Sequence, residues 1–336
     1  MTLSIRPLGN SGITLTALGL GGTALGNLYN PTSEVAAFAT IRAAFDDGIR
    51  FFDTAPLYGH GLSEHRLGGA FRTAHDMSFV LSTKVGWRLF PARGADPAAG
   101  HFKEVPPFRR ELDYSYDGVL RSFEDSLHRL GRDRVDIVLI HDCDRRNQGD
   151  DYPARFKESM DGAYRALLHL RDEGAVRAIG CGLNEWQACE DFARAGDFNC
   201  FLLAGRYTLL DQDSLDSFMP LCAERGIGII LGGPYNSGIL ASGAVEGAYY
   251  DYAPATPKIL DRVRRIQAVC RRHDVPLQTA ALQFPLFHPV VTTLIPGMRN
   301  PAEVVQNVAF LNHETPVAFW HELRHEKLIR EDAPLP

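Results

Sequence analysis

Four side chains that can donate, accept or steer a proton lie at or just beyond the carboxyl ends of predicted strands. Asp53 and Lys84 end the second and third of these strands, and His141 ends the fourth. Tyr58 lies a short turn beyond Asp53. Because the carboxyl ends of parallel strands gather at one mouth of a barrel or one edge of a sheet, we expect the four side chains to converge there.

Such a set suits acid–base chemistry by the tyrosine. A tyrosine has an unperturbed pKa of about 10, and bringing it to about 7 takes roughly 4 kcal/mol. A lysine ammonium about 4 Å away supplies roughly that amount at an effective dielectric of about 20. We therefore predict that Lys84 lowers the pKa of Tyr58, that Asp53 keeps the lysine charged, and that His141 exchanges a hydrogen bond with the reacting oxygen. The alternative is a structural ion pair beside an incidental tyrosine and histidine.

Residues 49–59 carry two of the four side chains. Residues 49–52 present apolar groups on both faces, which is typical of a parallel strand buried on both sides. Pro56 and Gly59 then favour a tight turn. Asp53 is therefore predicted at the end of a strand, although a helix cap or loop carboxylate is an open alternative for this residue taken alone.

Helical and strand-like patterns alternate along the chain. In residues 33–47 apolar side chains recur at helical spacing, and Gly48 ends the helix before the strand that leads to Asp53. The other predicted helices cover residues 64–71, 116–130, 161–172, 186–194, 215–225 and 257–273. The predicted strands cover residues 17–20, 49–52, 79–84, 135–141, 176–181, 200–203, 227–231 and 290–295. Eight strands alternating with helices predict a (β/α)8 TIM barrel, with a doubly wound sheet as the alternative.

The amino-terminal residues do not fit a Rossmann fold. A turn-forming cluster at residues 9–12, between β-type runs at 5–8 and 13–16, predicts a β-hairpin. Residues 19–24 match the glycine-rich dinucleotide fingerprint, but a Rossmann phosphate loop must run directly into a helix, and here the helix begins only near Ser33. We expect these glycines to let the backbone approach a ligand at the barrel mouth instead.

Three connections that follow predicted strands are long, at residues 86–115, 142–158 and 232–256. Because they follow strands, all three should gather at the carboxyl-terminal face of the barrel. They mix aromatic and charged residues, which suits the wall of a polar substrate site, although long loops can also be solvated irregular structure. We expect one domain over residues 1–330 and a frayed tail over residues 331–336.

Composition narrows the class of partner. The chain of 336 residues is 45% hydrophobic and 23% charged, with a net charge of −6 and no long run of Lys or Arg. This pattern argues against a nucleic-acid or membrane partner and favours a small-molecule substrate. Without a signal pattern or a long apolar stretch, we expect a cytoplasmic protein, monomeric or a small homo-oligomer. The six cysteines form no CxxC pair and are expected to be reduced and buried, and no metal is expected.

Several segments resemble the aldo-keto reductases, and the resemblance covers essentially the whole chain. The matching segments are residues 52–59, 62–68, 82–84, 136–141 and 295–299, followed by Asn307. The resemblance implies an oxidoreductase that binds NAD or NADP extended across the barrel mouth. It also implies that Tyr58 is the general acid and base, with Asp53, Lys84 and His141 as its partners.

The resemblance further implies which residues hold the cofactor. Asn184, after the fifth strand, would bind the carboxamide, and Ser237 would bind the pyrophosphate. The other implied contacts are Gly22, Thr23, Asp53, Pro234, Gly297, Arg299, Glu303 and Asn307.

The chain departs from the family pattern around the nicotinamide. The usual Ser-Asn after strand five is replaced by residues 182–184, the usual carboxamide glutamine by Ala204, and the usual stacking aromatic by Gly232. We expect Tyr207 or Tyr235 to supply the stacking.

Residues 21–29, 179–186, 204–212 and 232–238 resemble a sugar-oxidising branch of the family, which includes L-fucose (D-threo-aldose) 1-dehydrogenases, L-galactose dehydrogenases and pyridoxal 4-dehydrogenases. The resemblance implies oxidation of C1 of an aldopyranose to the lactone, with Trp87, His141 and Tyr152 as substrate contacts. The alternatives are pyridoxal oxidation, general aldehyde or ketone reduction, and a non-enzymatic regulatory subunit that binds the cofactor.

Overall fold

The computed structural model describes residues 3–72, 78–94 and 100–336. In this part of the chain eight parallel strands form one sheet, in the order β14-β11-β10-β9-β8-β5-β4-β3. Bridges from Leu18 to Leu294 and from Gly21 to Gly297 join the first strand to the last, which closes the sheet into a barrel. The strands are β3 (Leu20–Gly21), β4 (Phe51–Asp53), β5 (Val80–Val85), β8 (Ile137–His141), β9 (Ala178–Leu183), β10 (Cys200–Ala204), β11 (Gly228–Gly232) and β14 (Val291–Ile295).

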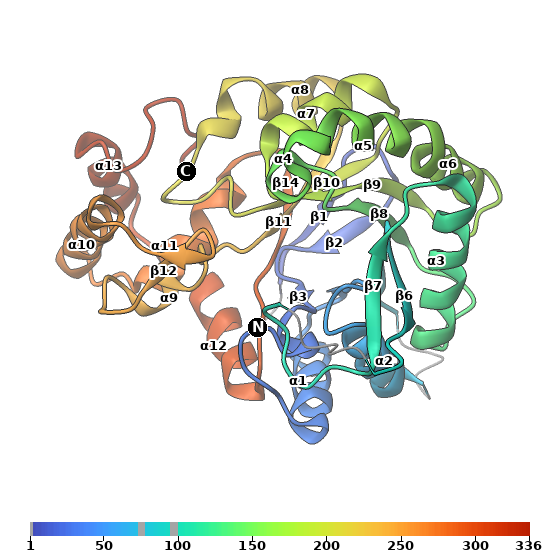
Figure 1. The fold of residues 1–336 in the computed structure, drawn as a ribbon. Coiled ribbons are helices and arrows are strands. Elements are labelled where there is room, and N and C mark those ends of the chain that lie inside the picture. The colour runs from blue at the N-terminus through green and yellow to red at the C-terminus, as the bar shows by residue number, and fades with distance from the viewer. Residues whose placement is uncertain (1–2, 73–77, 95–99) are drawn as a thin grey trace.

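Helices alternate with these strands and surround the barrel (Figure 1). Their ends follow from local chemistry: Ser33 Oγ accepts a hydrogen bond from the Ala36 amide at the start of α1, and Gly131 adopts a left-handed conformation where α3 ends. The bounds are α1 (Glu34–Asp46), α2 (Leu62–Phe71), α3 (Tyr116–Leu130), α6 (Arg165–Asp172), α7 (Trp186–Ala195), α8 (Phe218–Arg225) and α10 (Pro257–Arg272). The predicted (β/α)8 barrel is confirmed, and the doubly wound alternative is wrong.

The predicted N-terminal hairpin is also present, as β1 (Ile5–Pro7) paired antiparallel with β2 (Thr14–Thr16). Its apolar residues Leu8, Ile13 and Leu15 belong to the same buried cluster as the inward-facing residues of the barrel strands. The hairpin therefore plugs the amino-terminal end of the barrel, which leaves the carboxyl-terminal end for a ligand.

The three long connections contain regular structure. Residues 86–115 form a hairpin of β6 (Trp87–Pro91) and β7 (Phe108–Leu112), apart from residues 95–99, which lie outside the described residues. The second connection contains α4 (Arg145–Gln148), η2 (Gly149–Asp151) and α5 (Tyr152–Glu158), and the π-helical segment η3 (Ser159–Tyr164) leads from α5 into α6. The third contains α9 (Ile239–Ser242) and a small hairpin of β12 (Tyr249–Tyr250) and β13 (Ala253–Pro254).

Besides the short helices of the long connections, three α-helices of the described residues were not predicted, namely α11 (Leu277–Gln283) before β14, and α12 (Pro301–Leu311) and α13 (Val317–His325) after it. The expectation of a frayed tail at residues 331–336 is wrong for Ala333, which is 1% exposed and whose carbonyl accepts from Arg324 Nη2 at 2.6 Å. All six cysteines are buried and unpaired. Within the described ranges, every helix is too short or too polar to cross a membrane.

Candidate active site

Asp53, Lys84 and His141 share the inner face of the barrel because successive side chains of a strand alternate between its two faces. In β4, Phe51 belongs to the cluster inside the barrel and Phe52 to the outer core, so Asp53 faces inward. The same alternation along β5 and β8 turns Lys84 and His141 inward at the carboxyl ends of their strands.

Lys84 and Asp53 form a buried ion pair at the barrel mouth. Lys84 Nζ donates to Asp53 Oδ1 at 2.8 Å, to Asp53 Oδ2 at 2.7 Å and to the Thr54 carbonyl at 2.8 Å. Ser82 Oγ donates to Asp53 Oδ1 at 2.7 Å. Both charged side chains are 1% exposed, so the pair is sealed from bulk water.

Tyr58 lies over this pair. Lys84 Nζ is 4.6 Å from the centroid of the Tyr58 ring, and the ring meets His141 edge-on at 5.6 Å between centroids. The turn that carries the tyrosine is pressed against residues 24–26, since a Cβ added at Gly59 would lie 2.4 Å from the Gly26 carbonyl oxygen. Glycine, with a φ of 64° at position 59, is needed for this approach. The four predicted acid–base residues are therefore brought together.

The electrostatics of Tyr58 differ from the prediction. Burial raises the pKa of Tyr58 well above its ordinary value, and the carboxylates of Asp53 and Asp142 raise it further. The prediction that Lys84 brings this pKa to about 7 is wrong, because burial outweighs the positive charge of the lysine, which Asp53 at 2.7 Å partly compensates. At neutral pH the hydroxyl of Tyr58 is therefore protonated and can act as an acid.

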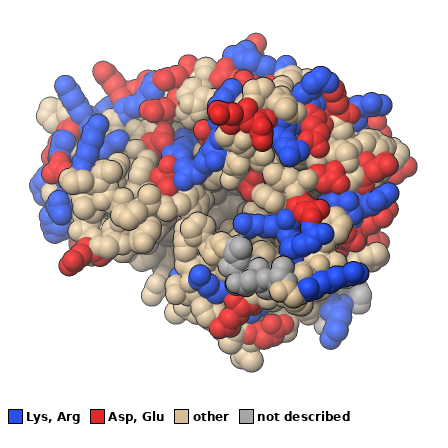
Figure 2. Space-filling model, in the orientation of Figure 1, with Lys and Arg blue, Asp and Glu red and all other residues tan. Residues whose placement is uncertain are grey.

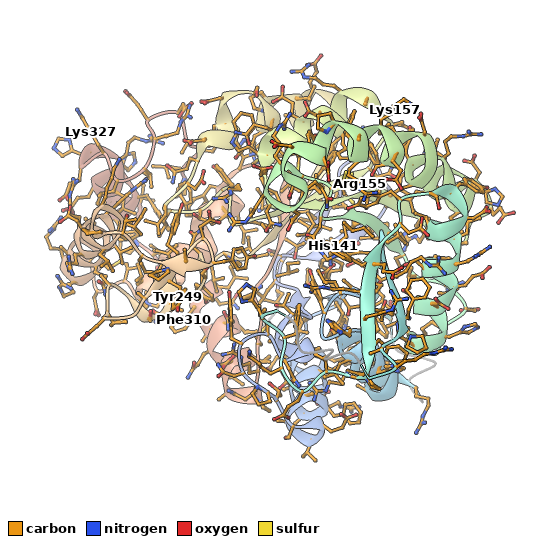
Figure 3. The ribbon with its side chains drawn as sticks, in the orientation of Figure 1. His141, Arg155, Lys157, Tyr249, Phe310 and Lys327 are labelled. Carbon is orange, nitrogen blue, oxygen red and sulfur yellow. The ribbon has the colours of Figure 1, made fainter. Side chains whose placement is uncertain are left out.

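His141 is neutral in this environment. Burial lowers the pKa of His141 well below its ordinary value, and the nearby Lys84 lowers it further. Tyr114 donates to the main-chain carbonyl of His141 at 2.7 Å, which holds the end of β8 in place. A neutral imidazole keeps one N–H to donate to a reacting oxygen, as the sequence-based hypothesis requires. Figure 3 shows His141 between the β6–β7 hairpin and the centre of the barrel.

Asp142 was missed by the sequence-based interpretation. It is 7% exposed, its Oδ2 accepts from Trp87 Nε1 at 2.9 Å, and its Oδ1 lies 3.5 Å from His141 Nε2. Trp87, a predicted substrate contact, therefore reaches the reaction centre through this aspartate. The signal in the sequence was an acidic residue directly after a strand-ending histidine.

A cavity of about 690 Å³ opens beside these groups, and Figure 2 shows the hollow near the centre of this face. It extends from Asp53 and Tyr58 past β10 and β11 to the start of α12. Of the predicted cofactor contacts, those that line it are Thr23, Asp53, Pro234, Tyr235, Ser237, Gly297, Arg299, Glu303 and Asn307.

At the far end of the cavity Glu303 lies in the first turn of α12, which Asn300 caps by accepting a hydrogen bond from the Glu303 amide at 2.9 Å. Its Oε2 accepts from the Arg299 amide at 2.8 Å, and its Oε1 accepts from Asn300 Nδ2 at 2.9 Å. The guanidinium of Arg299 reaches back to the Leu28 carbonyl at 3.1 Å. Arg299 and Glu303, both implied cofactor contacts, therefore lie at the cavity wall, and the carboxylate of Glu303 already accepts from two donors.

Besides Tyr207, two predicted cofactor contacts do not line the cavity. Gly22 lies behind the wall, where its amide donates to the Asp53 carbonyl at 2.8 Å and where a Cβ would lie 2.5 Å from Ser63 Oγ. Asn184 is held through its main chain, with its amide donating to Asp144 Oδ2 at 2.7 Å. Neither residue contacts the cavity in this structure.

Two predicted aromatic contacts belong to the hydrophobic core. Tyr207 is fully buried and stacks on Phe284 at 5.5 Å between centroids, so the expectation that it stacks on the nicotinamide is wrong. Tyr152 is 3% exposed and donates to Asp191 Oδ2 at 2.8 Å, so the expectation that it contacts substrate is wrong as well. Tyr235 remains on the cavity wall, where its hydroxyl donates to Asn307 Oδ1 at 2.6 Å.

The cavity suits an extended dinucleotide. Six of its lining residues are glycines, which let main-chain groups approach a ligand closely, and three of these have left-handed conformations that favour glycine. These glycines are Gly21, Gly205, Gly232, Gly233, Gly238 and Gly297. Among the described residues no group of three or more His, Cys, Asp or Glu side chains is arranged to hold a metal ion.

Comparisons with known proteins agree with this geometry. The sequence matches the Aldo/keto reductase family over residues 17–325. It is 42% identical to a pyridoxal 4-dehydrogenase of Microbacterium luteolum, covering 96% of this chain and 97% of the relative. It is 38% identical to a D-threo-aldose 1-dehydrogenase of a Pseudomonas species, covering 95% and 96% respectively.

Among solved structures, an aldo-keto reductase of Bacillus halodurans in its holo form superposes with a TM-score of 0.76 at 26% identity, over 98% of this chain and 97% of that one. The match to the family spans most of the sequence, and the relatives align with it almost from end to end. This chain therefore belongs to the aldo/keto reductase family, whose members are oxidoreductases.

Proposed function

We propose that this protein is an NAD(P)-dependent aldose 1-dehydrogenase that oxidises C1 of an aldopyranose of the L-fucose or D-threo-aldose type to the lactone. The observation that carries the proposal is the edge-on contact of the Tyr58 ring with the neutral His141, beside a cavity that is lined by Tyr58 and by most of the residues expected to hold an extended dinucleotide. The D-threo-aldose 1-dehydrogenase relative supports the substrate class.

The proposed chemistry assigns a step to each side chain. A nicotinamide bound in the cavity would supply the acceptor for the hydride of C1. Tyr58 takes the proton of the anomeric hydroxyl, and His141 donates a hydrogen bond to the same oxygen. Lys84 and Asp53 hold the tyrosine ring in place from below. In the reverse direction Tyr58 gives its proton to a carbonyl oxygen.

Pyridoxal oxidation is the second candidate, because the relative at 42% identity is a pyridoxal 4-dehydrogenase. A hemiacetal hydroxyl would meet Tyr58 in the same way. The regulatory-subunit alternative draws no support from a site in which all four acid–base residues converge.

A substrate scan tests the proposal. Purified protein would be assayed with NAD and NADP against L-fucose, L-galactose, pyridoxal and simple aldehydes, with the absorbance of the reduced cofactor as the readout. We expect the highest kcat/KM with an aldose. A higher value with pyridoxal would replace the first candidate by the second, and activity with simple aldehydes alone would contradict both.

The pH dependence should follow the raised pKa of Tyr58. We expect kcat/KM for oxidation to rise through the alkaline range without levelling off below about pH 10. The reason is that the base form of this buried tyrosine becomes populated only above that pH. Carbonyl reduction should fall over the same range, because it needs the protonated hydroxyl.

Lys84→Met should move the alkaline inflection upward, because the ammonium that stabilises the phenolate is gone. An inflection near pH 7 would instead report Asp142, whose pKa burial raises to about 7. A profile that is the same with and without Lys84 would contradict the proposed coupling.

Cofactor preference should depend on Glu303. We expect both cofactors to work, and Glu303→Gln to raise kcat/KM for NADP relative to NAD by about tenfold, or roughly 1.4 kcal/mol, because a carboxylate at the cavity wall repels a 2′-phosphate. Arg299→Ala is the matched test of the opposite charge. The ratio of kcat/KM for NADP to kcat/KM for NAD could stay unchanged in Glu303→Gln and collapse in Arg299→Ala. That result would mean that the arginine alone recognises the phosphate.

A further inference from the structure

Asp142 brings a second carboxyl group to the reaction centre. It follows His141 at the end of β8, and its side chain is 10% exposed. Its φ of 56° lies in the left-handed region, where aspartate and asparagine are tolerated and where strained residues often serve function. Its amide donates to the Gly182 carbonyl at 3.1 Å and its carbonyl accepts from Gln148 Nε2 at 2.8 Å, which fixes this conformation.

The two oxygens of Asp142 have different surroundings. Oδ2 accepts from Trp87 Nε1 at 2.9 Å. The donors recorded around Oδ1 in the described residues are His141 Nε2 and Asn147 Nδ2, both at 3.5 Å, the limit of a hydrogen bond. Asn147 Nδ2 also donates to Asp144 Oδ1 at 2.7 Å, which is the shorter of its two contacts. Oδ1 is therefore a buried acceptor whose lone pairs are barely used, and such a group costs free energy until a donor arrives.

The charges that face Asp142 leave it ionised under alkaline assay conditions. Burial raises the pKa of its carboxyl group to about 7, and the neighbouring Asp144 also raises it. Lys84 and Arg110 lower it, as does the hydrogen bond from Trp87. Above this pKa both oxygens of the group can only accept hydrogen bonds.

We propose that Asp142 Oδ1 accepts a hydrogen bond from a hydroxyl on the carbon next to the reacting carbon, so that the enzyme selects aldoses and other 2-hydroxy aldehydes over simple aldehydes. This rests on the proposed function, which sets the reacting oxygen between the Tyr58 hydroxyl and His141 Nε2. Oδ1 lies 3.5 Å from that same Nε2, so a hydroxyl on the neighbouring carbon comes within hydrogen-bond reach of it.

The test compares two aldehydes that differ by one hydroxyl, 2-hydroxypropanal and propanal, in the reduction direction with NADH or NADPH. The parent enzyme should prefer 2-hydroxypropanal by about tenfold or more in kcat/KM, as expected for a hydrogen bond to a charged group. Asp142→Asn should abolish the preference by lowering kcat/KM for 2-hydroxypropanal about tenfold more than kcat/KM for propanal, so the readout is the ratio of the two values.

Asparagine is chosen because it tolerates the left-handed backbone and its amide oxygen can still accept from Trp87. Its amide nitrogen then stands in place of Oδ1 and has no lone pair to offer. The matched control is Asp150→Asn, which removes an exposed charge from the same connection and should leave the preference unchanged. If Asp142→Asn does not fold, Trp87→Phe removes the donor that orients the carboxylate and should reduce the preference in part.

The outcomes separate this inference from the proposed function. The enzyme could show a preference for 2-hydroxypropanal that depends on Asp142 and yet fail to oxidise L-fucose or L-galactose. That result would contradict the proposed aldose 1-dehydrogenase function and still support the role of Asp142. Equal rates for the two aldehydes in the parent enzyme, no turnover of either, or a preference that survives Asp142→Asn would each overturn the inference.

Discussion

Replacing Tyr58 by phenylalanine will lower kcat by about 100-fold or more, because proton transfer by a well-placed side chain is typically worth that much. The change removes only the hydroxyl. The ring that lies 4.6 Å from Lys84 Nζ and meets His141 edge-on is kept, so the barrel and the cofactor cavity should be unaffected. Steady-state rates, together with cofactor binding followed by fluorescence, measure the two effects separately.

Tyr152→Phe is the matched control for this experiment. It also removes one hydroxyl from a buried tyrosine, but that hydroxyl donates to the partly exposed Asp191 and does not reach the cavity. Its kcat should stay within a few-fold of the parent, with a small loss of stability from the missing hydrogen bond. Activity of Tyr58→Phe within a few-fold of the parent would remove the tyrosine from the mechanism.

The positions of the acid–base residues could be predicted because they depend on strand order and on the two-residue period of a strand. Once β4, β5 and β8 are recognised as neighbours, Asp53, Lys84 and His141 must share one face and one end of the barrel. Neither the strand order nor the two-residue period depends on how side chains pack. The N-terminal hairpin could also be predicted without knowledge of packing, because the residues that form its turn are adjacent in the sequence.

The electrostatics and the aromatic contacts could not be predicted because they depend on packing. The pKa predicted for Tyr58 assumed that Lys84 is a free ammonium, whereas Asp53 partly compensates its charge and burial has the largest effect on that pKa. Nothing in the sequence distinguishes Tyr207 from Tyr235 as the ring that could stack on the nicotinamide. The stacking of Tyr207 on Phe284 shows that Tyr207 is the one that belongs to the core. The contact between Asp142 and Trp87 also depends on packing, because the β6–β7 hairpin brings Trp87 Nε1 to 2.9 Å from the carboxylate.

Whether Lys84 is catalytic or merely half of an ion pair can be decided by combining stability with activity. Lys84→Met alone leaves Asp53 buried, 1% exposed, without its counter-ion. Removing one partner of a buried pair costs about 3–5 kcal/mol, so the single variant should unfold at a clearly lower denaturant concentration. It should also lose activity, because the support beneath Tyr58 is gone.

The double variant Asp53→Asn, Lys84→Met removes both charges. Asparagine can still accept from Ser82 and can offer its amide N–H groups to the Thr54 carbonyl that the lysine served. Because a neutral replacement of a buried ion pair is often close to neutral in stability, most of the lost free energy of unfolding should return. Activity should not return, since the ammonium that stabilises the ionised tyrosine is still missing. Recovery of activity along with stability would mean that the pair is structural and that Tyr58 works without it.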